Sequence, residues 1–152
     1  MNPAPFLLRP AVEADSRPIQ LLIRQSGINP TGLDWRRFTL AVDAHNAMIG
    51  CVQIKSHSDG THELASLAVV PEWRGRGVAR VLIETLLQRE PRPLYLTCRA
   101  GLGPFYQRFG FRSLSASELP PYFRRIRRLA NVLIAMRFFE EDLLVMVCEE
   151  SG

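Results

Sequence analysis

A glycine-rich turn between an apolar run and a helical pattern constrains this chain more than any other feature. The apolar run covers residues 64–70, the turn reads Pro-Glu-Trp-Arg-Gly-Arg-Gly over residues 71–77, and residues 78–88 have helical spacing. The first N–H groups of a helix have no partner within it and carry the positive end of the helix dipole. Gly75 and Gly77 bring no side chain that would keep an anion away, and they allow positive φ. This order of strand, turn and helix predicts an anion site made of main-chain N–H groups.

The residues after the turn exclude two well-known phosphate-binding loops. A P-loop has Lys and then Ser or Thr after its last glycine, whereas Val78 and Ala79 follow here. A dinucleotide-binding loop has a third small residue where this chain has Arg80. The remaining pattern, Arg-x-x-Gly-x-Ala at Arg74, Gly77 and Ala79, resembles the loop that binds the diphosphate of acyl-CoA in the GCN5-related N-acetyltransferase (GNAT) family. The alternative is a surface turn that only begins a helix.

A second element further along the chain resembles the same family. The family has Phe-Tyr, three residues and Gly-Phe on a short helix that runs into a strand, and this chain has Phe105-Tyr106 followed by Gly110-Phe111. Gly110 suits the end of such a helix, where positive φ is favoured. The two elements occur in the family's order, and the resemblance covers residues 38–111.

The resemblance implies a fold and a cosubstrate. The fold is α+β in three layers, the acyl-CoA N-acyltransferase (GNAT) fold, with a mixed, mostly antiparallel sheet and flanking helices. The cosubstrate is acetyl-CoA, with no metal, and the acetyl group passes directly to a primary amine in a ternary complex. We expect residues 1–152 to form a single N-acetyltransferase domain. The cofactor-binding residues that the resemblance implies are Leu67, Ala68 and Val69 through their main chain, and Arg74, Gly75, Arg76, Gly77, Val78 and Ala79 of the turn.

Two side chains are candidates for acid–base catalysis. A tyrosine at the motif position of Tyr106 points at the CoA sulfur in the family, so Tyr106 would protonate the leaving thiolate; the alternative is an aromatic ring that only packs in the core. Several branches of the family have a glutamate at the position of Glu63, acting as the base directly or through water. The alternative is a strand-end Glu63 that faces solvent or pairs with an arginine. His62 points to the opposite face of the strand and is expected to be a bystander.

Arg99 is a candidate substrate-binding residue. Many members of the family have Asn at this position, and the sequence Leu-Thr-Cys-Arg resembles the amino-acid acetyltransferase branch, which includes N-acetylglutamate synthases. An arginine there would hold a substrate carboxylate with two hydrogen bonds, and the alternative is an arginine that faces solvent. Cys98, the thiol nearest to the expected site, has no histidine partner in its sequence context, so we expect no covalent enzyme intermediate.

The expected acceptor is a small-molecule amine, such as an amino acid. The segment 113–136 would cover the acceptor side, which favours a small amine over a protein lysine or N-terminus as the acceptor. Besides a small-molecule and a protein acetyltransferase, the third hypothesis is a domain that binds acyl-CoA without catalysis. A homodimer is common in the family.

Composition and charge argue against a nucleic-acid-binding, a membrane-spanning or a secreted protein. The net charge is +4, and the arginines in 124–128 have the spacing of a solvated helix face, so we expect no nucleic-acid partner. No apolar stretch is long enough to span a membrane, the start lacks the basic flank of a secretory signal, and the three isolated cysteines are typical of a reduced, cytoplasmic protein. The expected strands are 6–9, 38–42, 48–54, 62–70, 94–98 and 143–148, and the expected helices are one capped by Asp15 or Ser16, one over 78–88 and one after Pro120, with 131–136 left open between helix and strand.

Overall fold

The computed structural model describes residues 5–136 and 142–149. Strands and helices follow one another along the chain in the order that the sequence predicts, with one further short strand after the Gly-Phe element. The elements are β1 (Leu7–Pro10), α1 (Ser16–Gln25), β2 (Phe38–Val42), β3 (Met48–Ser56), β4 (His62–Val69), α2 (Val78–Arg89), β5 (Leu94–Arg99), α3 (Gly103–Gln107), β6 (Arg112–Ser113), α4 (Pro121–Ala135) and β7 (Leu143–Cys148).

The strands form a seven-stranded mixed sheet in the order β1-β2-β3-β4-β5-β7-β6. The pairs β1–β2, β2–β3, β5–β7 and β6–β7 are antiparallel. The pair β4–β5 is parallel, with His62 opposite Leu94 and Glu63 opposite Tyr95. This mixed, mostly antiparallel sheet with flanking helices confirms the predicted α+β fold.

The chain divides into two compact units, which are described separately. Unit 1 comprises residues 5–54 and 64–89 of the described chain, and unit 2 comprises residues 55–63, 90–136 and 142–149. The long strand β4 contributes its first two residues to unit 2 and the rest to unit 1.

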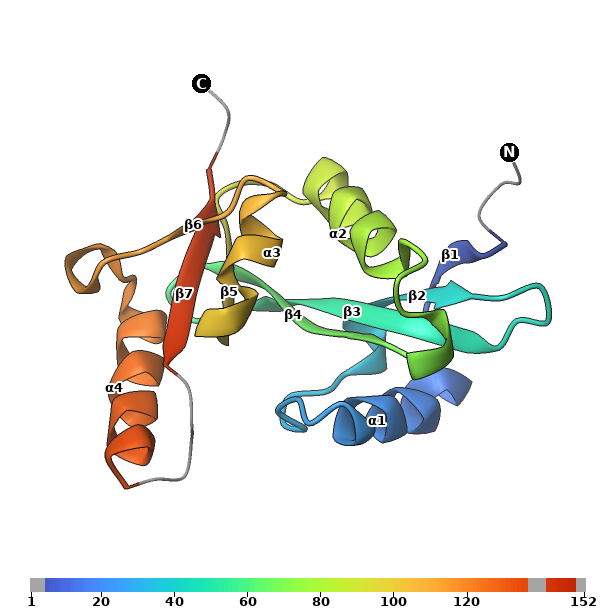
Figure 1. Cartoon of the computed structure of the whole chain (residues 1–152), viewed down its shortest axis with the longest axis horizontal. Coiled ribbons are helices and arrows are strands. Elements are labelled where there is room, and N and C mark those ends of the chain that lie inside the picture. Colours follow the sequence, from blue (N-terminus) through green and yellow to red (C-terminus); the bar gives the residue numbers. More distant parts are fainter. Residues whose placement is uncertain (1–4, 137–141, 150–152) are drawn as a thin grey trace. The chain divides into compact units, whose positions relative to one another are not determined.

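In unit 1, α1 and α2 lie on opposite faces of β2 and β3 (Figure 1). Alternate residues of β2 explain this arrangement, because side chains of a strand point to the two faces in turn. Thr39 of β2 lies on the α2 face, where it accepts a hydrogen bond from Arg89 of α2 at 3.2 Å. Phe38, Leu40 and Val42 of the same strand lie on the opposite face, in the core with α1. The core on the α1 face consists of Ala11, Ile19, Leu22, Ile23, Phe38, Leu40, Val42, Cys51 and Ala68.

In unit 2, α4 and α3 cover opposite faces of β5 and β7 (Figure 1). Tyr95 of β5 lies on the α4 face, where its ring stacks on Phe123 with 5.1 Å between centroids. Cys98 and Met146 lie on the α3 face, with their sulfur atoms 3.9 Å apart. The core on the α4 face consists of Leu114, Leu119, Phe123, Val145 and Val147.

Two local expectations are decided by the structure. Residues 131–135 are helical and belong to α4, so the strand alternative is wrong. Asp15, one of the two predicted residues, occupies the N-cap position of α1, but its side chain makes no cap hydrogen bond. The Asp15 carboxylate instead accepts from the Val12 N–H at 2.8 Å and from Arg9 at 2.7 Å. These hydrogen bonds and the Arg9 charge hold the pKa of Asp15 below its usual value, against the effect of burial.

Within the described residues, no helix is both long enough and apolar enough to cross a membrane. In the same part of the chain, no three His, Cys, Asp or Glu side chains gather as they would around a metal ion.

Candidate functional site

The turn before α2 has the geometry of an anion site. Gly75 and Gly77 have φ of +77° and +83°, the left-handed region that glycine adopts without strain. A Cβ atom at either position would meet no atom within 4 Å, so the space above this main chain is open. The first hydrogen bond of α2 is donated by the Val81 N–H to the Gly77 carbonyl at 3.1 Å. The N–H groups that precede Val81 in the helix therefore point outward without an intrahelical partner.

Exposed arginines surround this turn, together with the carboxylate of Glu72 and that of Glu84, which pairs with Arg80 at 3.0 Å. Arg74 donates through Nε to the Val69 carbonyl at 3.3 Å, which connects the turn to the end of β4. The Arg76 guanidinium lies over the Trp73 ring, 4.9 Å from its centroid. Arg74, Arg76 and Arg80 are all exposed. Their positive charge and the helix dipole favour a polyanionic ligand at the same place.

Gly50 fixes where α2 begins. A Cβ atom at Gly50 would lie 2.9 Å from Cγ1 of Val78 and 3.2 Å from the carbonyl oxygen of Ala68. Val78 is the first residue of α2 and is buried. The first turn of the helix therefore packs directly on the backbone of β3, which glycine alone permits. This contact holds the exposed N–H groups in a fixed position within unit 1.

The main chain of Leu67–Val69 follows an irregular residue in β4. Ser66 has φ of +58°, which is uncommon for a residue with a side chain and marks a local constraint. Its hydroxyl accepts a hydrogen bond from Gln53 at 2.7 Å, and its carbonyl accepts one from the Cys51 thiol at 3.6 Å. These two contacts from β3 hold Ser66 in its unusual conformation. A lone serine in an apolar strand gives no sequence signal of this kind.

Gln53 is fully buried and connects Ser66 to the loop before β2. Its amide nitrogen also donates to the Gly32 carbonyl at 3.3 Å, whereas its Oε1 has no hydrogen-bond partner. An unpaired buried oxygen costs about 1–3 kcal/mol, which the two donated hydrogen bonds offset in part. Gln53 thus couples the 29–34 loop to the irregular part of β4.

Tyr106 lies on α3 in unit 2 and is 8% exposed. Its ring makes edge contacts with Phe105 and Phe111, at 5.1 and 6.1 Å between centroids. Burial, and to a smaller extent Cys98, raise the pKa of Tyr106 to about 12. The phenol is therefore neutral at physiological pH and carries the hydrogen that a donor needs.

Cys98 is buried on the α3 face of β5. Burial raises the pKa of its thiol to about 11. Because the thiolate is the nucleophilic form, this thiol is a poor nucleophile at neutral pH.

Glu63 is buried at 6% exposure and does not face solvent or an arginine. Its Oε1 lies 2.7 Å from Nε2 of His57, and its Oε2 lies 3.5 Å from the hydroxyl of Thr97 on β5. His62 points elsewhere, with Nδ1 3.2 Å from the hydroxyl of Ser56. The structural alternatives that the sequence left for Glu63 are therefore wrong, while its catalytic role stays a prediction.

His57 is the residue near Glu63 that the sequence analysis missed. The turn between β3 and β4 places it opposite Thr61, whose carbonyl accepts from the His57 N–H at 2.9 Å. Thr61 and Glu63 point to the same face of the hairpin because they are two residues apart. The register of the Ser58-Asp59-Gly60 turn was therefore the signal that could have found His57.

Two contacts join this hairpin to α4. Asp59 accepts a hydrogen bond from the Tyr122 N–H at 3.0 Å, in the first turn of the helix. The His57 ring stacks on the Tyr122 ring, with 3.5 Å between centroids and 13° between planes. Burial first, and then the Glu63 charge, raise the pKa of Tyr122.

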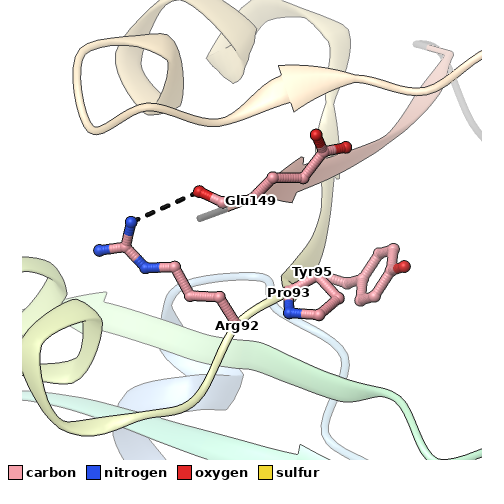
Figure 2. A pocket seen from close by; sticks show the side chains of 4 residues that line it. All are labelled: Arg92, Pro93, Tyr95 and Glu149. Atoms are coloured by element: carbon pink, nitrogen blue, oxygen red, sulfur yellow. Dashed lines mark hydrogen bonds between the residues drawn. The ribbon is translucent and has the colours of Figure 1, made fainter. Parts of the chain in front are cut away.

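Arg99 ends β5 and is exposed. Its main chain pairs with Leu143 of β7, whereas its side chain has no hydrogen bond or ion pair with any residue that the structure describes. Near the other end of β5, an open pocket is lined by Arg92, Pro93, Tyr95 and Glu149, with Arg92 donating to the Glu149 main-chain oxygen at 3.5 Å (Figure 2). None of the sequence-predicted site residues lines this pocket.

Comparison with known proteins supports the family resemblance. The family model of the acetyltransferase (GNAT) domain matches residues 34–113, more than half of the chain. A mycothiol acetyltransferase from Saccharopolyspora erythraea is 36% identical over 64 residues, which cover 42% of this chain and 20% of the relative. The chain thus spans about one fifth of the length of this curated relative.

Solved structures share the fold. N-acetylglutamate synthase from Neisseria gonorrhoeae, complexed with coenzyme A and L-arginine, has a TM-score of 0.72 at 22% identity, and the match covers 94% of this chain and 33% of that one. Rv2747 from Mycobacterium tuberculosis, in complex with CoA, has a TM-score of 0.70 at 19% identity, with 93% and 98% covered. At these identities the likeness establishes the fold.

Proposed function

Because the chain belongs to the acetyltransferase (GNAT) family, we propose that it transfers an acetyl group from acetyl-CoA to a primary amine of a small molecule. The observation that carries this proposal is the open turn of positive-φ glycines at the start of α2, within the region that the family model matches. The expected mechanism is direct transfer from the thioester to the amine in a ternary complex.

The turn from Arg74 to Ala79 would hold the diphosphate of acetyl-CoA. Its residues fit this group, because both glycines leave the main chain open and the first N–H groups of α2 lack partners within the helix. The exposed arginines add charge attraction without filling the space. The main chain of Leu67–Val69 would pair with the amide-rich arm of the cosubstrate.

Tyr106 would donate a hydrogen bond to the leaving sulfur. With a pKa of about 12, its phenol is a weaker acid than an ordinary thiol, whose pKa is about 8.5. Complete proton transfer from Tyr106 to the thiolate is therefore uphill, whereas a hydrogen bond that strengthens as negative charge develops is favourable. Tyr106 would therefore act as a hydrogen-bond donor that retains its proton, and not as an acid that gives it up.

Direct transfer agrees with the state of Cys98 in unit 2. Cys98, with a thiol pKa of about 11, is protonated at neutral pH and would attack the thioester slowly. Glu63 remains the carboxylate that would assist deprotonation of the amine.

An amino acid is the acceptor class that Arg99 favours. The unpartnered guanidinium of Arg99 would bind a carboxylate with two hydrogen bonds, the geometry for which arginine is suited. The likeness to N-acetylglutamate synthase supports the same class.

The proposal is tested by thiol release from acetyl-CoA with a panel of amino acids, amines without a carboxylate, and lysine-containing peptides. We expect the wild-type protein to turn over amino acids. In Arg99→Ala, the KM for the amino acid should rise while the KM for acetyl-CoA stays unchanged. Turnover with peptides alone would favour protein acetylation. Binding of CoA in calorimetry without thiol release from any amine would indicate a non-catalytic CoA-binding domain.

A further inference from the structure

The hydrogen bond between His57 and Glu63 decides which ring nitrogen of a neutral His57 has the lone pair. Nε2 lies 2.7 Å from the Glu63 carboxylate, which only accepts hydrogen bonds when ionised, so Nε2 carries the hydrogen in this pair. In a neutral imidazole the other nitrogen then has the lone pair. No group in the described part of the chain donates to Nδ1, and this atom is not sealed from water.

Three contacts hold the His57 ring in one orientation. The ring stacks on the Tyr122 ring with 3.5 Å between centroids, and it packs edge-on with the Phe123 ring, at 5.8 Å between centroids and 88° between planes. It is also hydrogen-bonded to Glu63. Asp59 strengthens this arrangement because it binds the first turn of α4 to the same hairpin. The His57 side chain is 10% exposed. A ring fixed in this way presents Nδ1 in a constant direction.

Glu63 is less suited than His57 to receive a proton from a substrate. Its side chain is 8% exposed, one oxygen is engaged by His57, and the other is near the Thr97 hydroxyl. A carboxylate bonded to one imidazole nitrogen fixes the tautomer and stabilises the imidazolium that forms when the other nitrogen gains a proton. The arrangement therefore assigns separate roles to the two residues.

We propose that His57, through Nδ1, accepts the proton of the substrate ammonium, and that Glu63 is the residue that positions and stabilises the His57 ring. This inference rests on the proposed acetyl transfer. Nδ1 takes one proton from the ammonium, which leaves the electron pair on the amine nitrogen, and later releases that proton to solvent. The C–N bond forms, the C–S bond breaks with its electron pair on sulfur, and the second proton from the nitrogen ends on the thiol.

The charged and titratable groups around His57 favour this assignment. They include Glu63 of β4, Asp59 of the turn, and Tyr122 of α4, on which the Arg125 charge also acts. Burial opposes ionisation of Asp59, but hydrogen bonds from Thr61 and Tyr122 outweigh it and lower the pKa of Asp59, so it is charged at neutral pH. The raised pKa of Tyr122 keeps its phenol neutral. Among these groups, the neutral imidazole of His57 is the one with a nitrogen lone pair that can accept a proton.

The test compares pH–rate profiles of His57→Gln and Glu63→Met. Gln retains an N–H donor for Glu63 but has no nitrogen lone pair, and Met removes the carboxylate without offering a donor that would reverse the imidazole tautomer. We expect His57→Gln to lose the acidic limb of kcat/KM and roughly 100-fold or more in kcat. Glu63→Met should retain the limb, because the His57 ring still carries the Nδ1 lone pair. A limb that persists in His57→Gln and disappears in Glu63→Met would overturn the inference and make Glu63 the base.

Two further variants control for folding and for histidine in general. His57→Phe retains the stack on Tyr122 and should lose the same limb, which keeps the test decisive if His57→Gln does not fold. His62→Gln alters the neighbouring histidine, which contacts Ser56, and should leave the profile unchanged. Wild-type protein that binds CoA but releases no thiol with any amine would contradict the proposed function, and the role of His57 with it. Normal turnover by His57→Gln would contradict the role of His57 alone.

Discussion

The turn before α2 in unit 1 and the His57–Glu63 pair in unit 2 are built in opposite ways. The turn consists of main chain in open space, where Gly75 and Gly77 contribute the absence of atoms. The pair consists of side chains that are about nine-tenths buried and in contact with β5 or α4. Adding atoms to the turn should therefore weaken its ligand binding, whereas removing side-chain atoms from it should have little effect. Removing side-chain atoms from the His57–Glu63 pair should instead impair its function.

Outside the His57–Glu63 pair, the largest effect is expected from removing a single oxygen elsewhere in unit 2. Tyr106→Phe deletes the hydrogen-bond donor for the leaving sulfur and should lower kcat by roughly 100-fold with little change in KM for acetyl-CoA. Steady-state kinetics measure both values. The matched control is Tyr95→Phe, whose ring packs on Phe123 on the other face of β5 and should retain full activity. Full activity of Tyr106→Phe would remove Tyr106 from the reaction.

Adding atoms in unit 1 should affect binding instead. Gly77→Val places a branched side chain at φ +83°, which costs about 1–3 kcal/mol and disturbs the N–H groups, so the Kd for CoA should rise roughly 10–100-fold in calorimetry. Gly27→Val is the control, because Gly27 has φ of +69° and open surroundings after α1. It should lose similar stability yet bind CoA normally. Equal affinities in the two variants would exclude the turn as the binding element.

A smaller addition should act through packing. Gly50→Ala brings a methyl group 2.9 Å from Val78 and should destabilise the protein by about 1–3 kcal/mol in urea unfolding, with weaker CoA binding. Val78→Ala, introduced together with Gly50→Ala, removes the Cγ1 atom that the new methyl group would meet at 2.9 Å. The double variant should therefore regain part of the loss, and strictly additive effects would show that Gly50 does not set the start of α2.

The smallest effect is expected from removing a side chain at the turn. Arg76→Ala should raise the Kd for CoA by only about 2–5-fold, because exposed charges contribute about 0.5–1 kcal/mol. The effect should shrink further as salt is added. A loss as large as that of Gly77→Val would mean that side chains, rather than main chain, hold the ligand.

The contrast between the two units also explains what the sequence could reveal. The turn is local: Gly75, Gly77 and the apolar run before them define it within a few residues, so its geometry was predicted. The strands and helices were predicted for the same reason, because periodicity and turn residues are local signals.

The features that were missed depend on contacts between distant residues. His57 meets Tyr122 only after the hairpin register and the position of α4 are known. Ser66 adopts positive φ because Gln53 and Cys51 hold it from another strand. Asp15, expected to cap α1, is engaged by Arg9 of β1, a competing partner that the sequence around the helix does not reveal.

The most direct test of the account follows the backbone amide resonances of the labelled protein during titration with CoA. If the main chain of the turn binds the diphosphate, the N–H signals of residues 75–79 will show the largest shifts and will saturate with the calorimetric affinity. Unchanged signals at these residues, with binding reported elsewhere in the chain, would contradict it.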